Sequence, residues 1–330
     1  MGEGCIIVTF VYSSDRNYVA LTAISAVSAL RYNPGARIVL LGYNLEGDAQ
    51  EIVRSRVCKA GGEFVYCDIS AALEQLKEKG YNGYTSYAAY ARIFIPQLLN
   101  DVKRVLYVDG DTLFNGSAEE LFDIDLCGKP FALGVDCVPI SYCKVINMSP
   151  HKVYFNSGVM LIDLDVWRSH NCTERFLNEL RHPAGPNPLA DQDIFCRVFN
   201  DEIALLPPKW NFISHFFLFS YNGLARVVGG EDRLRFSRDQ YSEAHKDPRI
   251  YHFLGNTLGR PWYTSSRHPM REAYRAAAKS ADLAEYAEQT KPMLLDYVLQ
   301  YNLHKYLPQE AFEIICNWLY RINIWRSYHV

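Results

Sequence analysis

Apolar runs alternate with amphipathic stretches over the first third of the chain. Residues 5–12 form an apolar run that predicts a strand, followed by a polar loop at 13–17 and a helix at 18–31. The same alternation then predicts strands at 36–43 and 63–68, and helices at 46–60, 71–80 and 86–99. Alternation of this kind indicates an α/β fold with a parallel sheet and right-handed crossovers.

The second half of the chain is less regular. Its apolar runs predict strands at 130–135, 153–164 and 249–255, and helices at 165–182 and 190–200. Near Arg267 the composition shifts, and the rest of the chain is helical in pattern. We therefore expect a main domain of residues 1–266 and a C-terminal helical extension of residues 267–330.

One predicted strand ends in two carboxylates. Residues 105–108 are apolar, as in a strand buried on both faces, and run directly into Asp109, Gly110 and Asp111. Side chains alternate along a strand, so both aspartates point to one side, where their repulsion favours a bound divalent cation. Open α/β sheets bind ligands at the carboxyl ends of their strands, so the 13–17 loop should face the same crevice.

Two other interpretations of this motif stay open. Asp-x-Asp is short and also occurs in solvated turns and helix caps. In aspartyl-phosphate phosphohydrolases a strand ends in the same motif and its first aspartate, here Asp109, is the nucleophile. Those enzymes place threonine two residues after the second aspartate, whereas Thr112 follows at once. We therefore rank the phosphohydrolase second.

Composition and charge limit the class of protein. The 330 residues carry a net charge of −3, which gives no reason to expect nucleic acid as a partner. The nine cysteines show no C-x-x-C pair, and no export signal or apolar membrane span is evident, so we expect a cytoplasmic protein. Neither G-x-G-x-x-G nor a P-loop occurs, and the 13–17 loop lacks the glycines of a sugar-1-phosphate nucleotidyltransferase.

Several sequence blocks occur in a recognisable order. They are SSDRNY, YARIFIPQLL, RVLYVDGDTLF, YFNSGVMLIDLDVWR, ADQDIF, and HFLG followed by RPW. This order resembles family 8 of the glycosyltransferases, retaining enzymes that include glycogenin and bacterial lipopolysaccharide α-galactosyl- and α-glucosyltransferases. The resemblance implies a Rossmann-like, single-domain, metal-dependent glycosyltransferase (GT-A type) fold, with a mixed, mostly parallel sheet and the helical extension added.

The resemblance also implies a reaction and a cofactor. A hexose would pass from UDP-glucose or UDP-galactose to a hydroxyl of a glycan acceptor, lipid-linked or protein-linked, in polysaccharide or lipopolysaccharide synthesis. Mn²⁺, or Mg²⁺ in its place, would be held by Asp109, Asp111 and His252. A non-catalytic glycan-binding relative would keep the scaffold and lose a metal ligand, whereas all three ligands are present here.

Further residues match the donor-binding positions of the family. Ser13, Asp15 and Asn17 resemble its uracil and ribose contacts, although they also suit a cap for the following helix. Arg92 resembles an arginine that contacts the donor sugar and phosphate, and an ion pair between elements is the alternative. Asn156 would bind sugar hydroxyls.

The predicted catalytic pair is Asp191 and Gln192. Asp191 would accept from a sugar hydroxyl and Gln192 would place its amide near the reacting carbon, although both also suit the acidic first turn of a helix. Because an amide is a poor nucleophile, we favour attack on the departing face over double displacement. Gly255 and Arg260 belong to the closing block, which departs from the family's Lys-Pro-Trp by two extra residues and by arginine.

The C-terminal extension ends in an aromatic and basic stretch. Trp318, Tyr320 and Trp325 lie beside Arg321 and Arg326. This mixture suits a helix at the inner face of a membrane, which would make the protein peripheral. It also suits packing on its own domain or on a second subunit, which is the commoner arrangement, so a homo-oligomer is compatible with the sequence.

Overall fold

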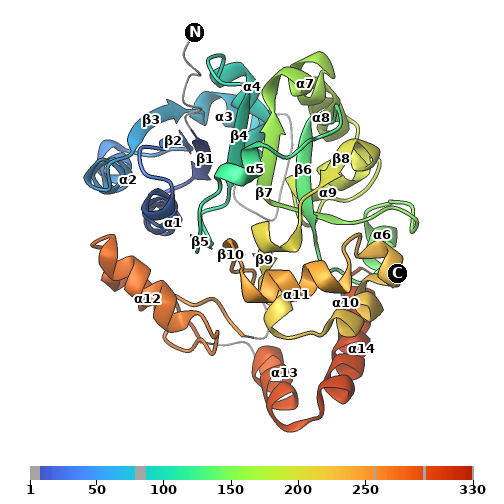
Figure 1. The fold of residues 1–330 in the computed structure, drawn as a ribbon. Coiled ribbons are helices and arrows are strands. Elements are labelled where there is room, and N and C mark those ends of the chain that lie inside the picture. The colour runs from blue at the N-terminus through green and yellow to red at the C-terminus, as the bar shows by residue number, and fades with distance from the viewer. Residues whose placement is uncertain (1–7, 79–86, 256–257, 293–294, 329–330) are drawn as a thin grey trace.

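A seven-stranded sheet forms the centre of the computed structural model, which describes residues 8–78, 87–255, 258–292 and 295–328. Its order is β3-β2-β1-β4-β7-β6-β8 (Figure 1). The strands are β1 (Thr9–Ser14), β2 (Arg37–Gly42), β3 (Glu63–Asp68), β4 (Arg104–Val108), β6 (Phe131–Val135), β7 (Phe155–Asp163) and β8 (Ile203–Leu205). Only β7 runs antiparallel to its described neighbours, β4 and β6, so the predicted mixed, mostly parallel sheet is confirmed.

A second sheet has three short strands in the order β5-β10-β9. They are β5 (Thr112–Phe114), β10 (Ile250–His252) and β9 (Phe212–Ile213). β10 pairs antiparallel with β5, and this register sets His252 opposite Thr112. Since Thr112 follows Asp111, the small sheet brings a histidine from late in the chain to the acidic end of β4.

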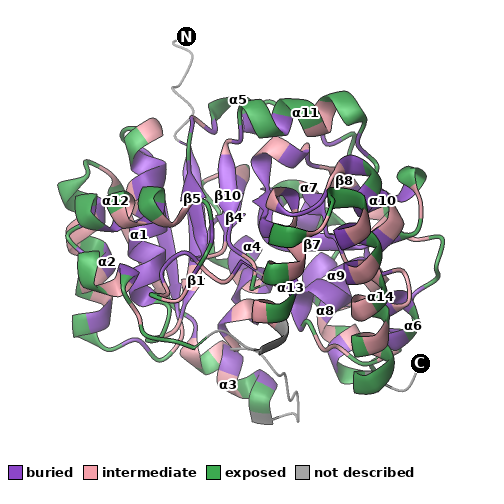
Figure 2. Cartoon of the chain, turned by 90° about the horizontal axis from the view of Figure 1, so that it is seen from below, coloured by how far each residue is buried: buried purple, intermediate pink, exposed green. Residues whose placement is uncertain are grey.

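Helices surround the sheets, and Figure 2 shows buried strands between helices whose outer sides are exposed. Every residue of β7 is buried. None of the described helices is both long and apolar enough to span a membrane. The helices are α1 (Val19–Tyr32), α2 (Gly47–Lys59), α3 (Ser70–Glu78), α4 (Ile95–Leu98), α5 (Glu119–Phe122), α6 (Tyr142–Val145), α7 (Leu164–Ser169), α8 (Cys172–Arg181), α9 (Asp191–Val198), α10 (Tyr221–Val228), α11 (Arg238–Lys246), α12 (Arg271–Ser280), α13 (Leu295–Tyr306) and α14 (Gln309–Tyr328).

Several predicted elements differ from the structure; the strand predicted at 249–255, for example, is only Ile250–His252. The first strand is Thr9–Ser14 rather than 5–12, because the two serines at its end still pair with β2; residues 5–7 lie outside the described part. The helix predicted at 165–182 is divided into α7 and α8, since Asn171 adopts a left-handed φ of 52°. The helix predicted at 86–99 is mostly a 3₁₀ segment, η1 (Tyr87–Phe94), followed by the short α4, in which Pro96 is the second residue and has no N–H to donate.

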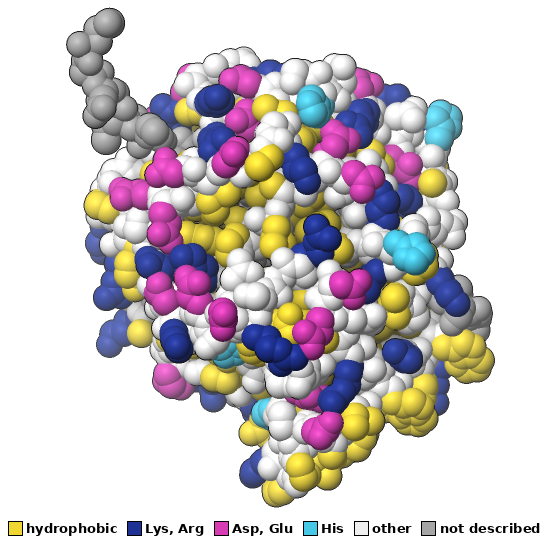
Figure 3. Space-filling view, turned by 45° about the vertical axis from the view of Figure 1, so that its right-hand side comes forward, with side chains coloured by type: hydrophobic (Ala, Val, Ile, Leu, Met, Phe, Trp, Pro, Cys, Tyr) yellow, Lys and Arg dark blue, Asp and Glu magenta, His cyan; other side chains and the backbone are white. Residues whose placement is uncertain are grey.

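The C-terminal helices α13 and α14 lie at the lower end of the molecule in Figure 1. α14 packs on α10 through one side, where Phe312 and Cys316 are fully buried. Large apolar side chains on other sides of the pair are exposed, and Figure 3 shows hydrophobic side chains on this protruding part. They are Leu299, Tyr306, Ile314, Trp318 and Trp325.

Candidate active site

A cavity of about 640 Å³ lies at the carboxyl ends of β1 and β4. Of the site residues predicted from the sequence, all except Asn17 line it. Those that do are Ser13, Asp15, Arg92, Asp109, Gly110, Asp111, Asn156, Asp191, Gln192, His252, Gly255 and Arg260. Asn17 is exposed and lies outside the lining. One concave site therefore collects residues from both halves of the chain.

Three of the lining residues converge on one point. Asp109, Asp111 and His252 each offer a ligand atom, and these atoms lie within 4.8 Å of one another. His252 Nε2 is 3.3 Å from Asp111 Oδ1. Two carboxylates and an imidazole are a donor set that suits Mn²⁺ and that Mg²⁺ can also use. The residues present therefore fit a divalent cation.

Two glycines keep this point open. A Cβ on Gly158 of β7 would lie 2.2 Å from His252 Cε1 and 2.7 Å from Asp109 Oδ2, so any side chain there would fill the space between the two ligands. A Cβ on Gly110 would lie 2.5 Å from Thr22 Oγ1 of α1. Glycine at both positions lets β4, β7 and α1 approach closely enough to form the site.

Each aspartate is paired with an arginine. Arg92 Nη2 donates to Asp109 Oδ1 at 3.0 Å, and Arg260 Nη1 lies 3.1 Å from Asp111 Oδ2. Burial on its own would raise the pKa of Asp111, but Arg260 and then His252 hold it below its usual value. Burial on its own would lower the pKa of His252, but the hydrogen bond to Asp111 raises this pKa above its usual value. Cationic neighbours therefore offset the repulsion between the two carboxylates.

Asp191 is the first residue of α9, and one of its carboxylate oxygens accepts no hydrogen bond. Its Oδ2 is 3.1 Å from Arg92 Nε, but that N–H donates to the carbonyl of Ala89, and Oδ2 has no hydrogen-bond partner. Burial raises the pKa of Asp191 to about 6, against the opposing charge of Arg92. The preceding Ala190 has φ 53°, a strained conformation for a residue with a Cβ. A buried carboxylate of the cavity wall thus follows a strained backbone position.

A chain of side-chain amides links the histidine to the catalytic candidates. Asn211 Nδ2 donates to Asn156 Oδ1 at 2.9 Å, and Asn156 Nδ2 donates to Gln192 Oε1 at 3.2 Å. Gln192 Nε2 in turn donates to Asp136 Oδ2 at 2.9 Å. Because both ends of the Gln192 amide are engaged, its orientation is fixed.

Near the carboxyl end of β1, side chains that line the cavity also make hydrogen bonds within the protein. The hydroxyls of Ser13 and Tyr107 are 2.6 Å apart, and Tyr107 donates to Asp109 Oδ1 at 2.8 Å. Asp15 Oδ1 accepts from the backbone N–H groups of Asn17 and Tyr18 at 2.9 and 3.3 Å. These bonds close a turn that leads into α1 rather than a cap, because the N-cap residue of α1 is Tyr18 and no side chain caps it. The Asp15 carboxylate lies in the cavity wall.

Sequence reasoning missed four residues of this site. They are Tyr107, Asp136, Asn211 and His215. Asp136 directly follows the apolar run of β6, as Asp109 follows β4, so the same signal would have found it. Asn211 and His215 lie in a segment of short elements and carry no local pattern.

The chain matches one protein family over most of its length. The family model described as "Glycosyl transferase family 8" matches residues 9–265. The chain is similar to "General stress protein A" of Bacillus subtilis, with 32% identity over 197 residues, 58% of this chain and 65% of that protein. It is 24% identical to the lipopolysaccharide 1,3-galactosyltransferase of Salmonella typhimurium over 82% of this chain and 77% of that protein. In the first three relatives the matches span 65%, 62% and 60% of their own lengths, less than two thirds.

Solved structures show the same fold. The galactosyltransferase LgtC, in complex with donor and acceptor sugar analogs, superposes with a TM-score of 0.66 at 21% identity, covering 88% of this chain and 99% of that one. Apo GlyE of Streptococcus pneumoniae TIGR4 gives a TM-score of 0.57 at 20% identity, covering 97% and 63%. At these identities the likeness concerns the path of the chain.

Proposed function

Since the chain belongs to glycosyl transferase family 8, we propose that it moves a hexose, glucose or galactose, from a UDP-sugar to a hydroxyl of a glycan acceptor with retention. The expected GT-A type fold with its helical extension is confirmed. The observation that carries the proposal is the convergence of Asp109, Asp111 and His252 within 4.8 Å in the cavity. Asp109, Asp111 and His252 would hold a divalent cation, Mn²⁺ or Mg²⁺, which would supply Lewis-acid stabilisation of charge on the departing diphosphate.

The nucleotide would lie along the end of β1. Ser13 and Asp15 offer short polar groups at the cavity wall to the uracil and ribose. Asn17 could join them only with its side chain turned towards the cavity. Arg260 and the backbone of Gly255 line the cavity beside Asp111, where a guanidinium can bind diphosphate oxygens.

The donor sugar would lie between β7 and α9. Asp191 Oδ2, buried without a hydrogen-bond partner, is suited to accept from a sugar hydroxyl. Asn156 and Gln192 line the same wall, and Arg92 holds Asp191 and Asp109 on either side of its guanidinium. Binding of a hydroxyl at Asp191 would give a hydrogen bond to an oxygen that has only the ion pair with Arg92.

Attack on the departing face agrees best with the surroundings of the candidate nucleophiles. The Gln192 amide is a poor nucleophile, and Asp193 is fully buried with hydrogen bonds from Tyr154 and the backbone of Leu189. We propose that the acceptor attacks on that face and that a phosphate oxygen takes its proton. A sugar adduct trapped on Gln192 or Asp193 during turnover would instead establish double displacement.

A lipid-linked or protein-linked glycan is the proposed acceptor, because relatives of the chain include lipopolysaccharide transferases. The exposed Trp318 and Trp325 on α14, with Arg321 and Arg326 beside them, suit peripheral contact with an anionic membrane. Flotation with anionic liposomes should recover the wild type and leave Trp318→Ala/Trp325→Ala behind; equal recovery would contradict membrane contact. The boundary between residues 266 and 267 stays a prediction.

A panel of UDP-sugars tests the function without knowledge of the acceptor. We expect slow, Mn²⁺-dependent hydrolysis of UDP-glucose or UDP-galactose, since water can replace the acceptor hydroxyl. Asp111→Asn should abolish hydrolysis together with Mn²⁺ binding. Phosphate release that needs no uridine would favour the phosphohydrolase, and UDP binding without turnover would favour a non-catalytic relative.

A further inference from the structure

Two residues of the cavity wall are neither metal ligands nor proposed contacts of the donor. Asp136 follows β6 and His215 lies in the 3₁₀ segment η4 (Ser214–Phe217), and both line the cavity together with Val138. Asp136 is buried, and its Oδ2 accepts from Gln192 Nε2 at 2.9 Å and Asn156 Nδ2 at 3.1 Å. These residues therefore adjoin the reacting end of the cavity rather than the nucleotide end at β1.

The His215 ring has an unused hydrogen-bonding group. Its Nδ1 is buried and has no hydrogen-bond partner. Because a ligand cannot reach a buried atom and His215 lines the cavity, contact with a ligand would be through Nε2. Burial lowers the pKa of His215, with Asp136 opposing, which keeps the imidazole neutral near pH 7. A neutral imidazole can donate to or accept from a hydroxyl, and the neighbouring carboxylate can accept from a second one.

The C-terminal helix holds this ring in place. The His215 ring makes an edge-to-face contact with Tyr320 of α14, with centroids 6.5 Å apart. Tyr320 also contacts Phe219, whose N–H donates to the His215 carbonyl at 3.0 Å. The segment that presents His215 to the cavity is therefore packed directly on α14.

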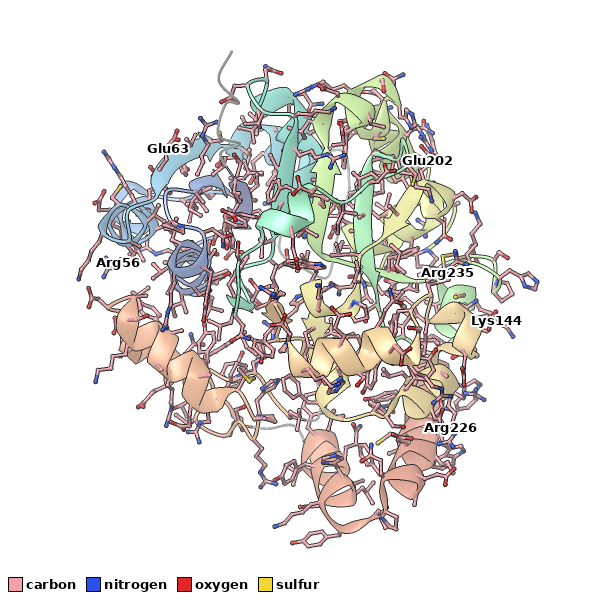
Figure 4. The ribbon with its side chains drawn as sticks, in the orientation of Figure 1. Arg56, Glu63, Lys144, Glu202, Arg226 and Arg235 are labelled. Atoms are coloured by element: carbon pink, nitrogen blue, oxygen red, sulfur yellow. The ribbon has the colours of Figure 1, made fainter. Side chains whose placement is uncertain are left out.

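α14 is itself fixed to that segment by a buried carboxylate. Glu313, only 2% exposed, accepts from the backbone N–H of Ser220 at 2.6 Å, at the N-terminus of α10. It also accepts from Gln309 Nε2 at 2.8 Å and pairs with Arg226, which Figure 4 shows beside α14. A buried charge with several partners gives α14 one defined position on the domain.

We propose that Asp136 and His215 form the subsite for a hydroxyl of the acceptor sugar, and that α14 positions His215 in it through Tyr320. The inference rests on the proposed function. The C-terminal helix thus belongs to the acceptor side of the active site, although it lies outside the matched family region, residues 9–265.

The test compares transfer with hydrolysis, using p-nitrophenyl glycosides of glucose, galactose and lactose as acceptor probes. His215→Ala should raise the KM for the accepted glycoside about tenfold, the effect of one lost hydrogen bond. His215→Gln, which keeps a polar group near the Nε2 position, should restore part of it. Tyr320→Ala should produce a similar rise while hydrolysis without acceptor stays unchanged, and Tyr320→Phe, which keeps the ring, should behave as wild type.

The outcomes separate the two proposals. An unchanged glycoside KM in Tyr320→Ala, or equal losses of hydrolysis and transfer, would overturn the role of α14. A wild-type enzyme that hydrolyses UDP-sugar but transfers to no glycoside of the panel would overturn the subsite. A wild-type enzyme without hydrolysis or transfer would instead overturn the proposed function.

Discussion

Asn211 Oδ1 lies 3.0 Å from His252 Nδ1, and both side chains are buried. An amide oxygen can only accept a hydrogen bond, so Nδ1 must carry the proton of the neutral ring. Nε2, on the side of Asp109 and Asp111, then keeps its lone pair for a metal. The asparagine therefore selects the tautomer in which His252 can act as a ligand.

Removal of this acceptor should weaken metal binding. We expect Asn211→Ala to lower the Mn²⁺ affinity by about 10- to 100-fold, as loss of such a supporting contact usually does. Asn211→Asp keeps an oxygen for Nδ1 and should bind Mn²⁺ more tightly than the alanine variant. Titration calorimetry with Mn²⁺ in the absence of nucleotide measures both, and equal affinities of Asn211→Ala and wild type would contradict the role.

The open space beside the ligands gives a second prediction. Gly158→Ala would place a Cβ 2.2 Å from the His252 ring, so the ring or β7 must shift. We expect a stability loss of about 1–3 kcal/mol from overpacking and a large loss of Mn²⁺ affinity. Gly47→Ala is the matched control, because no atom lies within 4 Å of its added Cβ. Wild-type Mn²⁺ affinity in Gly158→Ala would show that the site lies elsewhere.

The sequence predicted the elements that long apolar runs define. β3 has the bounds expected for it, and β2 and β4 differ by a residue or so at their ends. β5 and β9, with three and two residues, are too short for any periodicity. They exist because β10 pairs with both of them, which is a tertiary fact that no local pattern contains.

The residues of the site also fall into two groups, those that a local sequence pattern predicts and those that it does not. Asp109 and Asp111 follow an apolar run and are visible locally, whereas the place of His252 came from the family resemblance. Asn211 and His215 lie in short irregular segments, and their roles depend on what the fold sets against them. Local sequence thus identifies groups at strand ends, and the partners that orient them emerge only in three dimensions.

Stability should depend on the buried Asp193. Burial raises its pKa to about 6, against hydrogen bonds that include one from Tyr154, whereas an aspartate in an unfolded chain titrates near 3.9. The folded state therefore binds the extra proton, and this stabilisation is complete below about pH 4 and lost as the pH rises through about 6.

Asp193→Asn tests this dependence. The free energy of unfolding of the variant, relative to wild type, should increase by roughly 2 kcal/mol between about pH 4.5 and 7.5, because only wild type loses stabilisation over that interval. Urea unfolding at a series of pH values measures the difference. A difference that stays constant with pH would mean that Asp193 titrates alike in both states.

The last prediction concerns the buried charges around Arg92. Its guanidinium, 2% exposed, lies between Asp109 and Asp191, and Asp191 is 3% exposed. Arg92→Met would leave Asp191 buried without its cation, which should cost about 3–5 kcal/mol in the free energy of unfolding. The double variant Arg92→Met/Asp191→Asn removes both charges and should be more stable than Arg92→Met alone, although it would lack the proposed sugar contact.

Urea unfolding near neutral pH compares wild type, the two single variants and the double variant. If the two single effects simply add in the double variant, the pairing of these charges contributes nothing to stability, and Arg92 serves only the donor substrate.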